Sequence, residues 1–219
     1  MDLSSIIDLG SFVTWCDYLG TLAFAISGIR LAAGKGFDWV GAYVVGFVTA
    51  VGGGTIRDIL LDIKPFWLVQ PSYLIITALG LVFTIIFRRQ VVRLNHSLFF
   101  FDAVGLGLFV VVGVAKSYAG GFPWWVAVIM GTITGSFGGL LRDVLIRETP
   151  LIFRTDFYAS ACMLGGVVYV LLGHYTQLPI EIVQFFSALS VLLLRVLAVV
   201  LHIQLPTFHP QDPDKHPQV

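Results

Sequence analysis

Charged residues are scarce in this sequence: Lys and Arg number 13 and Asp and Glu number 13 among 219 residues, or 12%. Soluble domains carry about twice that share. The formal net charge of zero and the lack of a basic stripe exclude nucleic acid as an expected partner. Apolar residues make up 57% of the chain, and the mean hydropathy is +0.90. This composition predicts an integral membrane protein.

Several chemical signatures are also missing. The two cysteines, Cys16 and Cys162, have no motif spacing, so neither a disulfide framework nor a metal site is expected. His202, His209 and His216 recur every seven residues, but prolines between them argue against a metal-binding helix. No Ser/His/Asp or Cys/His arrangement is evident, so we expect neither an enzyme nor a cofactor. The N-terminus lacks the basic region of a cleaved signal peptide, and its first apolar stretch should remain as a span.

The long apolar runs predict helices rather than short alternating strands. Each is long enough to cross about 30 Å of hydrocarbon as a helix. We expect seven transmembrane helices, at residues 13–33, 38–61, 71–88, 98–115, 123–145, 157–174 and 180–203. The predicted fold is therefore an all-α integral membrane protein.

Basic residues between the spans predict the orientation. Arg88, Arg89 and Arg93 follow the third span, and Arg30 and Lys35 lie at the end of the first, so both loops should be cytoplasmic. The chain would then be a multi-pass protein of a bacterial or archaeal inner membrane. Its parts would be an extracytoplasmic N-terminus (1–12), a three-helix repeat (13–94), a second repeat (95–178), a seventh helix (179–204) and a disordered cytoplasmic tail (205–219).

The two halves of the chain repeat the same pattern. The stretch "GGGTIRDILL" (52–61) aligns with "FGGLLRDVLI" (137–146) at an offset of 85 residues. The offset holds without a gap for Asp17 and Asp102, and for Tyr73 and Tyr158. A second copy that begins after three crossings enters the membrane from the opposite side, so we expect two inverted three-helix repeats.

Glycines gather where the repeats match best. Gly131, Gly135 and Gly139 form a small-residue stripe suited to close helix packing, as do Gly46, Ala50 and Gly54. Packing does not explain Gly52, Gly53 or Gly138, which make consecutive runs with Gly54 and Gly139 instead of one helix face. We predict a kink or an unwound turn at both sites, with packing alone as the alternative.

Each glycine run is followed by an Arg-Asp pair, Arg57-Asp58 and Arg142-Asp143. Charges inside a span are costly and favour a functional site facing a cavity. The alternative is interfacial placement, in which Arg57 reaches the headgroups or pairs with Asp58 or Asp17 without any transport role. Because the pair recurs in both halves, we predict that it lines or gates a polar path, with Asp17 and Asp102 as counter-charges.

Further polar side chains belong to this hypothesis. Lys116 has Leu31 as its repeat partner and is either a moving gate or an interfacial anchor. Hydroxyl groups are candidates to line the path with freed backbone carbonyls: Ser27, Thr49, Thr55, Thr134 and Ser136. A bare arginine would repel a cation, so Arg57 and Arg142 should be neutralised by carboxylates or bound to backbone carbonyls.

These motifs, with "SGIRLAAGKGFDWVGA" before the first and a seventh helix after the second repeat, resemble the prokaryotic branch of the TRIC (trimeric intracellular cation) channels over residues 15–203. The resemblance implies a homotrimer in membrane lipid, with a hydrated pore for K⁺ or Na⁺ in each subunit. That pore would run between the repeats, flanked by helices two and five, which bend at their glycine motifs. Phe137 departs from the family's glycine triplet. In animal members a lysine on helix four is associated with gating, and Lys116 is on the corresponding helix.

Two other functions remain open on the sequence. Inverted repeats also build carriers, and such chains are sometimes labelled glycine transporters, so a transporter of a small zwitterion such as glycine is the alternative. A membrane scaffold would explain the packing glycines, but it would not explain the duplicated Arg-Asp pairs.

Overall fold

The computed structural model describes residues 12–87, 95–154 and 157–203, and every regular element in them is helical. In chain order the elements are α1 (Phe12–Gly34), α2 (Trp39–Leu60), α3 (Phe66–Val69), α4 (Ser72–Ile86), α6 (Asn95–Ala119), α7 (Trp124–Leu145), η2 (Leu151–Phe153), α8 (Ala159–Tyr175) and α9 (Ile180–Val200). The prediction of an all-α protein is confirmed. Arg88, Arg89, Arg93, His209, His216 and the predicted tail lie outside the described residues.

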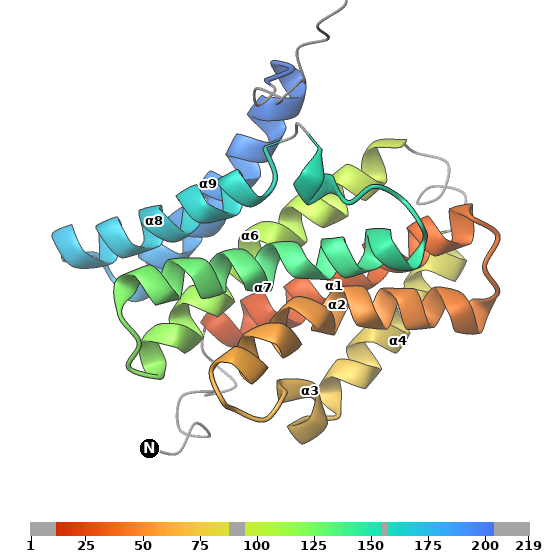
Figure 1. The fold of residues 1–219 in the computed structure, drawn as a ribbon, viewed down its shortest axis with the longest axis horizontal. Helices are drawn as coiled ribbons and strands as arrows, with labels where there is room; N and C mark the ends of the chain where they lie inside the picture. Colours follow the sequence, from red (N-terminus) through yellow and green to blue (C-terminus); the bar gives the residue numbers. More distant parts are fainter. Residues whose placement is uncertain (1–11, 88–94, 155–156, 204–219) are drawn as a thin grey trace, which may run out of the picture.

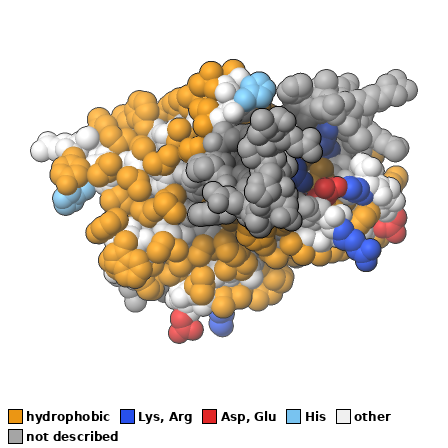
Figure 2. Space-filling model, turned by 45° about the horizontal axis from the view of Figure 1, so that its top comes forward, with side chains coloured by type: hydrophobic (Ala, Val, Ile, Leu, Met, Phe, Trp, Pro, Cys, Tyr) orange, Lys and Arg blue, Asp and Glu red, His pale blue; other side chains and the backbone are white. Residues whose placement is uncertain are grey.

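Five of these helices are long and apolar enough to cross a membrane: α1, α2, α6, α7 and α9. α4 and α8 fall on the predicted third and sixth spans but are shorter, with 15 and 17 residues. The predicted count of seven spans is therefore matched by five helices of spanning length and two shorter apolar ones. Large hydrophobic side chains are exposed along these helices, and they cover most of the described surface seen in Figure 2. The protein is a multi-pass membrane protein.

Four helices form the centre of the molecule. α1 packs on α2 and α6, and α7 packs on the same two helices, so the four enclose a common core. α4 covers α1 and α2, while α8 covers α7 and α6, and α9 packs on α8 and α6 (Figure 1). The α1–α2 and α6–α7 connections lie at opposite ends of the bundle (Figure 1). The two repeats therefore run in opposite directions.

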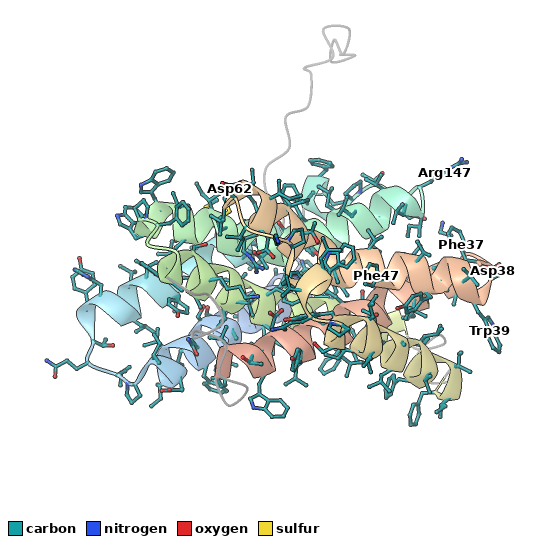
Figure 3. All side chains as sticks on the ribbon, turned by 90° about the horizontal axis from the view of Figure 1, so that it is seen from below. Phe37, Asp38, Trp39, Phe47, Asp62 and Arg147 are labelled. Carbon is teal, nitrogen blue, oxygen red and sulfur yellow. The ribbon has the colours of Figure 1, made fainter. Side chains whose placement is uncertain are left out.

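The inversion is also visible at the ends of α2 and α7. Asp38, just before α2, and Arg147, just after α7, lie at one end of the molecule, and Asp62, just after α2, lies away from them (Figure 3). Asp62 and Arg147 are repeat equivalents, and both have a positive φ, of 56° and 59°. Such a φ is uncommon for a residue with a side chain. The duplication therefore extends to the backbone conformation that ends each helix.

The small-residue stripes are used for helix packing, as predicted. A Cβ atom on Gly28 would lie 2.9 Å from the Cα of Gly46, and one on Gly113 would lie 2.7 Å from the Cα of Gly131. α1 therefore crosses α2, and α6 crosses α7, at equivalent pairs of glycines. Such crossings let two backbones approach closely in a membrane, where no hydrophobic effect drives helices together.

Candidate functional site

The first Arg-Asp pair is buried at the end of α2. Arg57 and Asp58 are each 1% exposed, and Nε and Nη2 of Arg57 donate hydrogen bonds of 2.8 and 2.6 Å to Oδ1 of Asp58. The other carboxylate oxygen, Oδ2, accepts the backbone N–H of Phe66 at 2.9 Å. Asp58 thus neutralises the arginine and also anchors the start of α3. This burial argues against an arginine that reaches out to headgroups, whereas the pairing with Asp58 fits both a site on a polar path and the alternative of an ion pair with no transport role.

A second ion pair lies beside it. Nζ of Lys116, on α6, donates a hydrogen bond of 2.8 Å to Oδ2 of Asp17, on α1, and Tyr73 on α4 donates one of 2.9 Å to the same oxygen. The ring of Phe66 lies between the two cations, with its centroid 5.1 Å from Lys116 Nζ and 5.8 Å from Arg57 Cζ. Lys116 is therefore an ion-paired cation whose side chain is only 11% exposed, and its roles as a moving gate or an interfacial anchor stay predictions. We call Asp17, Arg57, Asp58 and Lys116 the first cluster.

The equivalent cluster surrounds Arg142 on α7, which is fully buried. Its Nε donates a hydrogen bond of 2.8 Å to Asp143, and its Nη1 donates bonds of 2.6 Å to Asp102 and 2.8 Å to the hydroxyl of Ser27. Asp143 also accepts the backbone N–H of Leu151, at 3.0 Å, as Asp58 does for Phe66. Ser27, Asp102, Arg142 and Asp143 form what we call the second cluster.

Aromatic contacts complete the second cluster. The hydroxyl of Tyr158 donates a hydrogen bond of 3.3 Å to Asp102, and Cζ of Arg195, on α9, lies 4.9 Å from the centroid of the Tyr158 ring. Arg195 is 3% exposed, and its Nη1 donates a hydrogen bond of 3.1 Å to the carbonyl of Phe157. The formal charges in this region, those of Arg142, Arg195, Asp102 and Asp143, sum to zero.

The prediction that each arginine is neutralised by carboxylates is confirmed in the described residues: Arg57 pairs with Asp58, and Arg142 pairs with Asp102 and Asp143. Asp17 was predicted as a counter-charge to the Arg-Asp pairs, but its ion pair is with Lys116 of the other repeat. The lysine has no equivalent in the second cluster, so the two ends of the molecule differ.

The consecutive glycines in α2 face three different neighbours. A Cβ on Gly52 would meet the Leu141 side chain at 2.5 Å, one on Gly54 would meet the Phe66 ring at 2.5 Å, and one on Gly53 would overlap the carbonyl oxygen of Thr134. Gly53 has no room for a side chain because it faces the backbone of α7, whereas a larger residue at Gly52 or Gly54 would have to displace a neighbouring side chain.

The second glycine run makes the matching contacts. A Cβ on Gly138 would overlap the carbonyl oxygen of Thr49, which is the repeat counterpart of Gly53 on Thr134, and one on Gly139 would overlap the hydroxyl of Tyr158. α2 and α7 are helical without a break through both runs. The predicted unwound turn is therefore wrong, while a kink within each unbroken helix stays a prediction. The close contacts agree with the packing alternative. Two carbonyls lie against two glycines where α2 and α7 cross.

The candidate hydroxyl groups are all hydrogen-bonded. Four of them donate to the carbonyl four residues earlier in their own helix, and these are Thr49, Thr55, Thr134 and Ser136. Thr55 also accepts the indole N–H of Trp67 at 3.0 Å, and Ser27 accepts from Arg142. In this conformation, therefore, Ser27 is the candidate hydroxyl that joins a charged cluster.

Polar atoms without a partner occur in the second cluster. Among the described residues, Oδ2 of Asp102 and Nη2 of Arg142 are buried and make no hydrogen bond within the protein. The same holds for Nε of Arg195 and Oγ of Ser160, which lie outside the cluster as defined. Buried polar groups are almost always bonded to protein or ordered water. The second cluster therefore has the capacity to bind water or a small polar molecule.

An exposed ion pair joins the repeats near the end of α7. Lys35, after α1, donates a hydrogen bond to Glu148, after α7, and Arg154 lies 3.7 Å from the other oxygen of Glu148. The hydrogen bond from Lys35 lowers the pKa of the Glu148 carboxyl below its usual range. This contact would be lost when the pH falls through that lowered pKa, and its exposure makes it weak.

Sequence reasoning missed four participants. Phe66 follows Pro65 in a connecting segment, and nothing in its local pattern marks it. Tyr73 and Tyr158 were recognised only as markers of the repeat. Arg195 did carry a signal, since it is a lone arginine inside an apolar helix, and such residues indicate buried polar contacts.

Sequence comparisons match both halves of the chain. The family model described as "Glycine transporter" matches residues 14–89 and again residues 99–174, one match for each repeat. The UPF0126 inner membrane protein YadS of Escherichia coli K12 is 44% identical over 198 residues, which cover 90% of this chain and 96% of that protein. A UPF0126 membrane protein of Vibrio cholerae is 38% identical over 197 residues, which cover 88% of this chain and 81% of that protein.

Comparisons with solved structures agree. A TRIC cation channel solved to explain conductance is 36% identical, with a TM-score of 0.81 over 92% of this chain and 99% of the channel chain. The TRIC orthologue from Rhodobacter sphaeroides is 34% identical, with a TM-score of 0.82 over 87% of this chain and 98% of that one. The similarity therefore extends over the repeats and the helix that follows them.

Proposed function

Since this chain belongs to the family that contains the UPF0126 membrane proteins and the prokaryotic TRIC channels, we propose that it is a channel for monovalent cations. The similar structures are described as trimeric cation channels, which supports a homotrimer. In our proposal K⁺ or Na⁺ passes through each subunit on a path flanked by α2 and α7. All seven apolar helices would lie in lipid, with the N-terminus and the first cluster outside and the C-terminus and the second cluster on the cytoplasmic side.

The observation that carries the proposal is the compensation of charge at both ends of the bundle. The first cluster holds two acids and two bases, and the second holds two acids and one base, with Arg195 nearby. A cation that approaches either cluster therefore meets no excess of positive charge among the ion-paired groups. Arg57 and Arg142 would then serve to hold carboxylates in place at membrane depth rather than to repel the ion.

The conformation described above corresponds to a closed channel in this proposal. Gly53 and Gly138 lie against threonine carbonyls of the facing helix, and the hydroxyls of Thr49 and Thr134 are turned to carbonyls of their own helices. Conduction would require α2 and α7 to separate at this crossing. Separation would free the two carbonyls and two hydroxyls as oxygen ligands for a partly dehydrated ion.

A transporter of a small zwitterion such as glycine is the second candidate. The description of the matching family model favours it, and so does one feature of the second cluster. Oδ2 of Asp102 is a free acceptor suited to an ammonium group, and Nη2 of Arg142 is a free donor suited to a carboxylate. A saturable carrier would use these two atoms for the two ends of one substrate.

Recording from purified protein in planar bilayers under a KCl gradient tests the proposal. Unitary currents that reverse toward the K⁺ equilibrium potential are expected, and Arg57→Ala and Arg142→Ala should change the conductance or its voltage dependence. Arg154→Ala, which removes an exposed cation, is the matched control and should conduct like the wild type. If folded protein is silent in the bilayer but liposomes accumulate labelled glycine saturably, the carrier replaces the channel.

A further inference from the structure

Two phenylalanines meet at the centre of the molecule. Phe24 on α1 and Phe109 on α6 are repeat equivalents, 0% and 3% exposed, and their rings form an edge-to-face pair with centroids 5.1 Å apart. A Cβ on Gly20 would lie 2.9 Å from the Phe109 ring, and one on Gly105 would overlap the Phe24 ring. Because two equivalent residues contact each other, the pair lies at the pseudo-two-fold axis that relates the repeats.

This pair lies between the two charged clusters. Asp17 precedes Phe24 by seven residues, which is about 10 Å along a helix, and its partner Lys116 follows Phe109 by the same distance. In the other direction, Ser27 follows Phe24 by three residues and binds Arg142. An ion that moves between the clusters inside the four-helix core must therefore pass the two rings.

The layer around the rings presents little that a cation would bind. The Phe24 ring lies 3.3 Å from the Cβ position of Gly138, next to the point where α2 and α7 cross. The hydroxyls of Thr49 and Thr134 at this crossing donate bonds of 2.6 Å to carbonyls of their own helices. In this conformation, therefore, the two rings meet beside a crossing whose hydroxyls are turned to their own helices, and a charged cluster lies on either side.

We propose that Phe24 and Phe109 form a hydrophobic gate at the centre of the subunit, closed when their rings touch and opened when they separate. The inference rests on the proposed channel function. A narrow apolar segment blocks ions because water leaves it, so an ion would have to enter without its hydration shell. Polar clusters above and below the gate would keep the ion hydrated until the constriction. Removing either ring should therefore favour the open, wet state.

The test is K⁺ flux through reconstituted protein, with the open probability from single-channel records. Phe24→Ala and Phe109→Ala should each raise the open probability about tenfold, the factor equivalent to about 1.4 kcal/mol of preference for the closed state. Ile29→Ala is the matched control, because Ile29 is also a buried side chain of α1 but packs on Gly46 of α2, away from the pair. It should lower the melting temperature without changing the open probability.

Phe24→Leu and Phe109→Leu cover the case in which the alanine variants fail to fold, and these smaller apolar side chains should give an intermediate increase. If the wild type conducts and folded variants at both positions keep its open probability, the gate is wrong and the channel function stands. A wild type that does not conduct at all overturns the channel function and the gate together.

Discussion

Lys116 and Asp17 are 99 positions apart in the chain, and the lysine ammonium donates a 2.8 Å hydrogen bond to the aspartate carboxylate. The pair connects the second repeat to the first at one end of the bundle. At the other end Leu31 takes the position equivalent to Lys116, and Asp102 is paired with Arg142 instead. A duplicated scaffold thus carries one ionic link that the duplication does not repeat.

Lys116→Met should leave Asp17 as a buried carboxylate without its cation. Breaking a buried ion pair costs about 3–5 kcal/mol, and the side chains of Lys116 and Asp17 are only 11% and 6% exposed. We expect a loss of that order in the free energy of unfolding, measured by denaturation in detergent. Adding Asp17→Asn, which keeps an acceptor for Tyr73, should recover most of it. A single variant as stable as the wild type would contradict the assignment of this pair.

Gly53→Ala and Gly138→Ala should each force α2 and α7 apart. A methyl group at either position overlaps a threonine carbonyl oxygen of the facing helix, and overpacking of this kind costs about 1–3 kcal/mol. Gly173→Ala is the control, because a Cβ there meets nothing within 4 Å, and alanine should stabilise α8 slightly. Equal melting temperatures for all three variants would show that the α2–α7 crossing is not tightly packed.

Asp58→Asn should be more damaging than Asp143→Asn. Among the described residues, Asp58 provides the ion pair of Arg57, whereas Arg142 retains Asp102 when Asp143 is neutralised. We expect about 3–5 kcal/mol for the first change and about 1–2 kcal/mol for the second. Unfolding of both proteins in one detergent measures the difference, with Glu148→Gln as a control that removes an exposed carboxylate. The reverse order would indicate that Arg57 is neutralised by another group.

Arg195→Lys should weaken the contact of α9 with the second cluster. The guanidinium lies over the rings of Tyr158 and Phe99 and also donates to the Phe157 carbonyl, a combination that a lysine ammonium does not reproduce. A loss of about 1–2 kcal/mol in unfolding free energy is expected. Arg154→Lys changes an exposed residue in the same way and should leave stability unaltered. An equal effect of the two substitutions would contradict a stabilising contact between Arg195 and the second cluster.

Much of the architecture could be predicted from the pattern of residues. The 85-residue offset indicated inverted repeats because an odd number of crossings reverses the second copy, and the predicted windows fall on the observed helices. Neutralisation of Arg57 and Arg142 was predicted because a bare arginine would repel a cation on the path. The error concerned Gly52, Gly53 and Gly138. Consecutive glycines are compatible with a broken helix and with an unbroken one that is closely approached, and only the neighbouring helix distinguishes the two.

The sequence alone specifies which parts of this protein are duplicated, because the 85-residue offset aligns the glycine runs, the Arg-Asp pairs, and Asp17 and Tyr73 with their counterparts, without a gap. It does not specify which side chains meet across the two copies. Lys116 reaches Asp17, Arg142 reaches Ser27, and Phe24 meets Phe109 only because α1 and α6 pack antiparallel about the pseudo-two-fold axis. Contacts between distant segments depend on how whole helices pack, and no local pattern encodes that geometry.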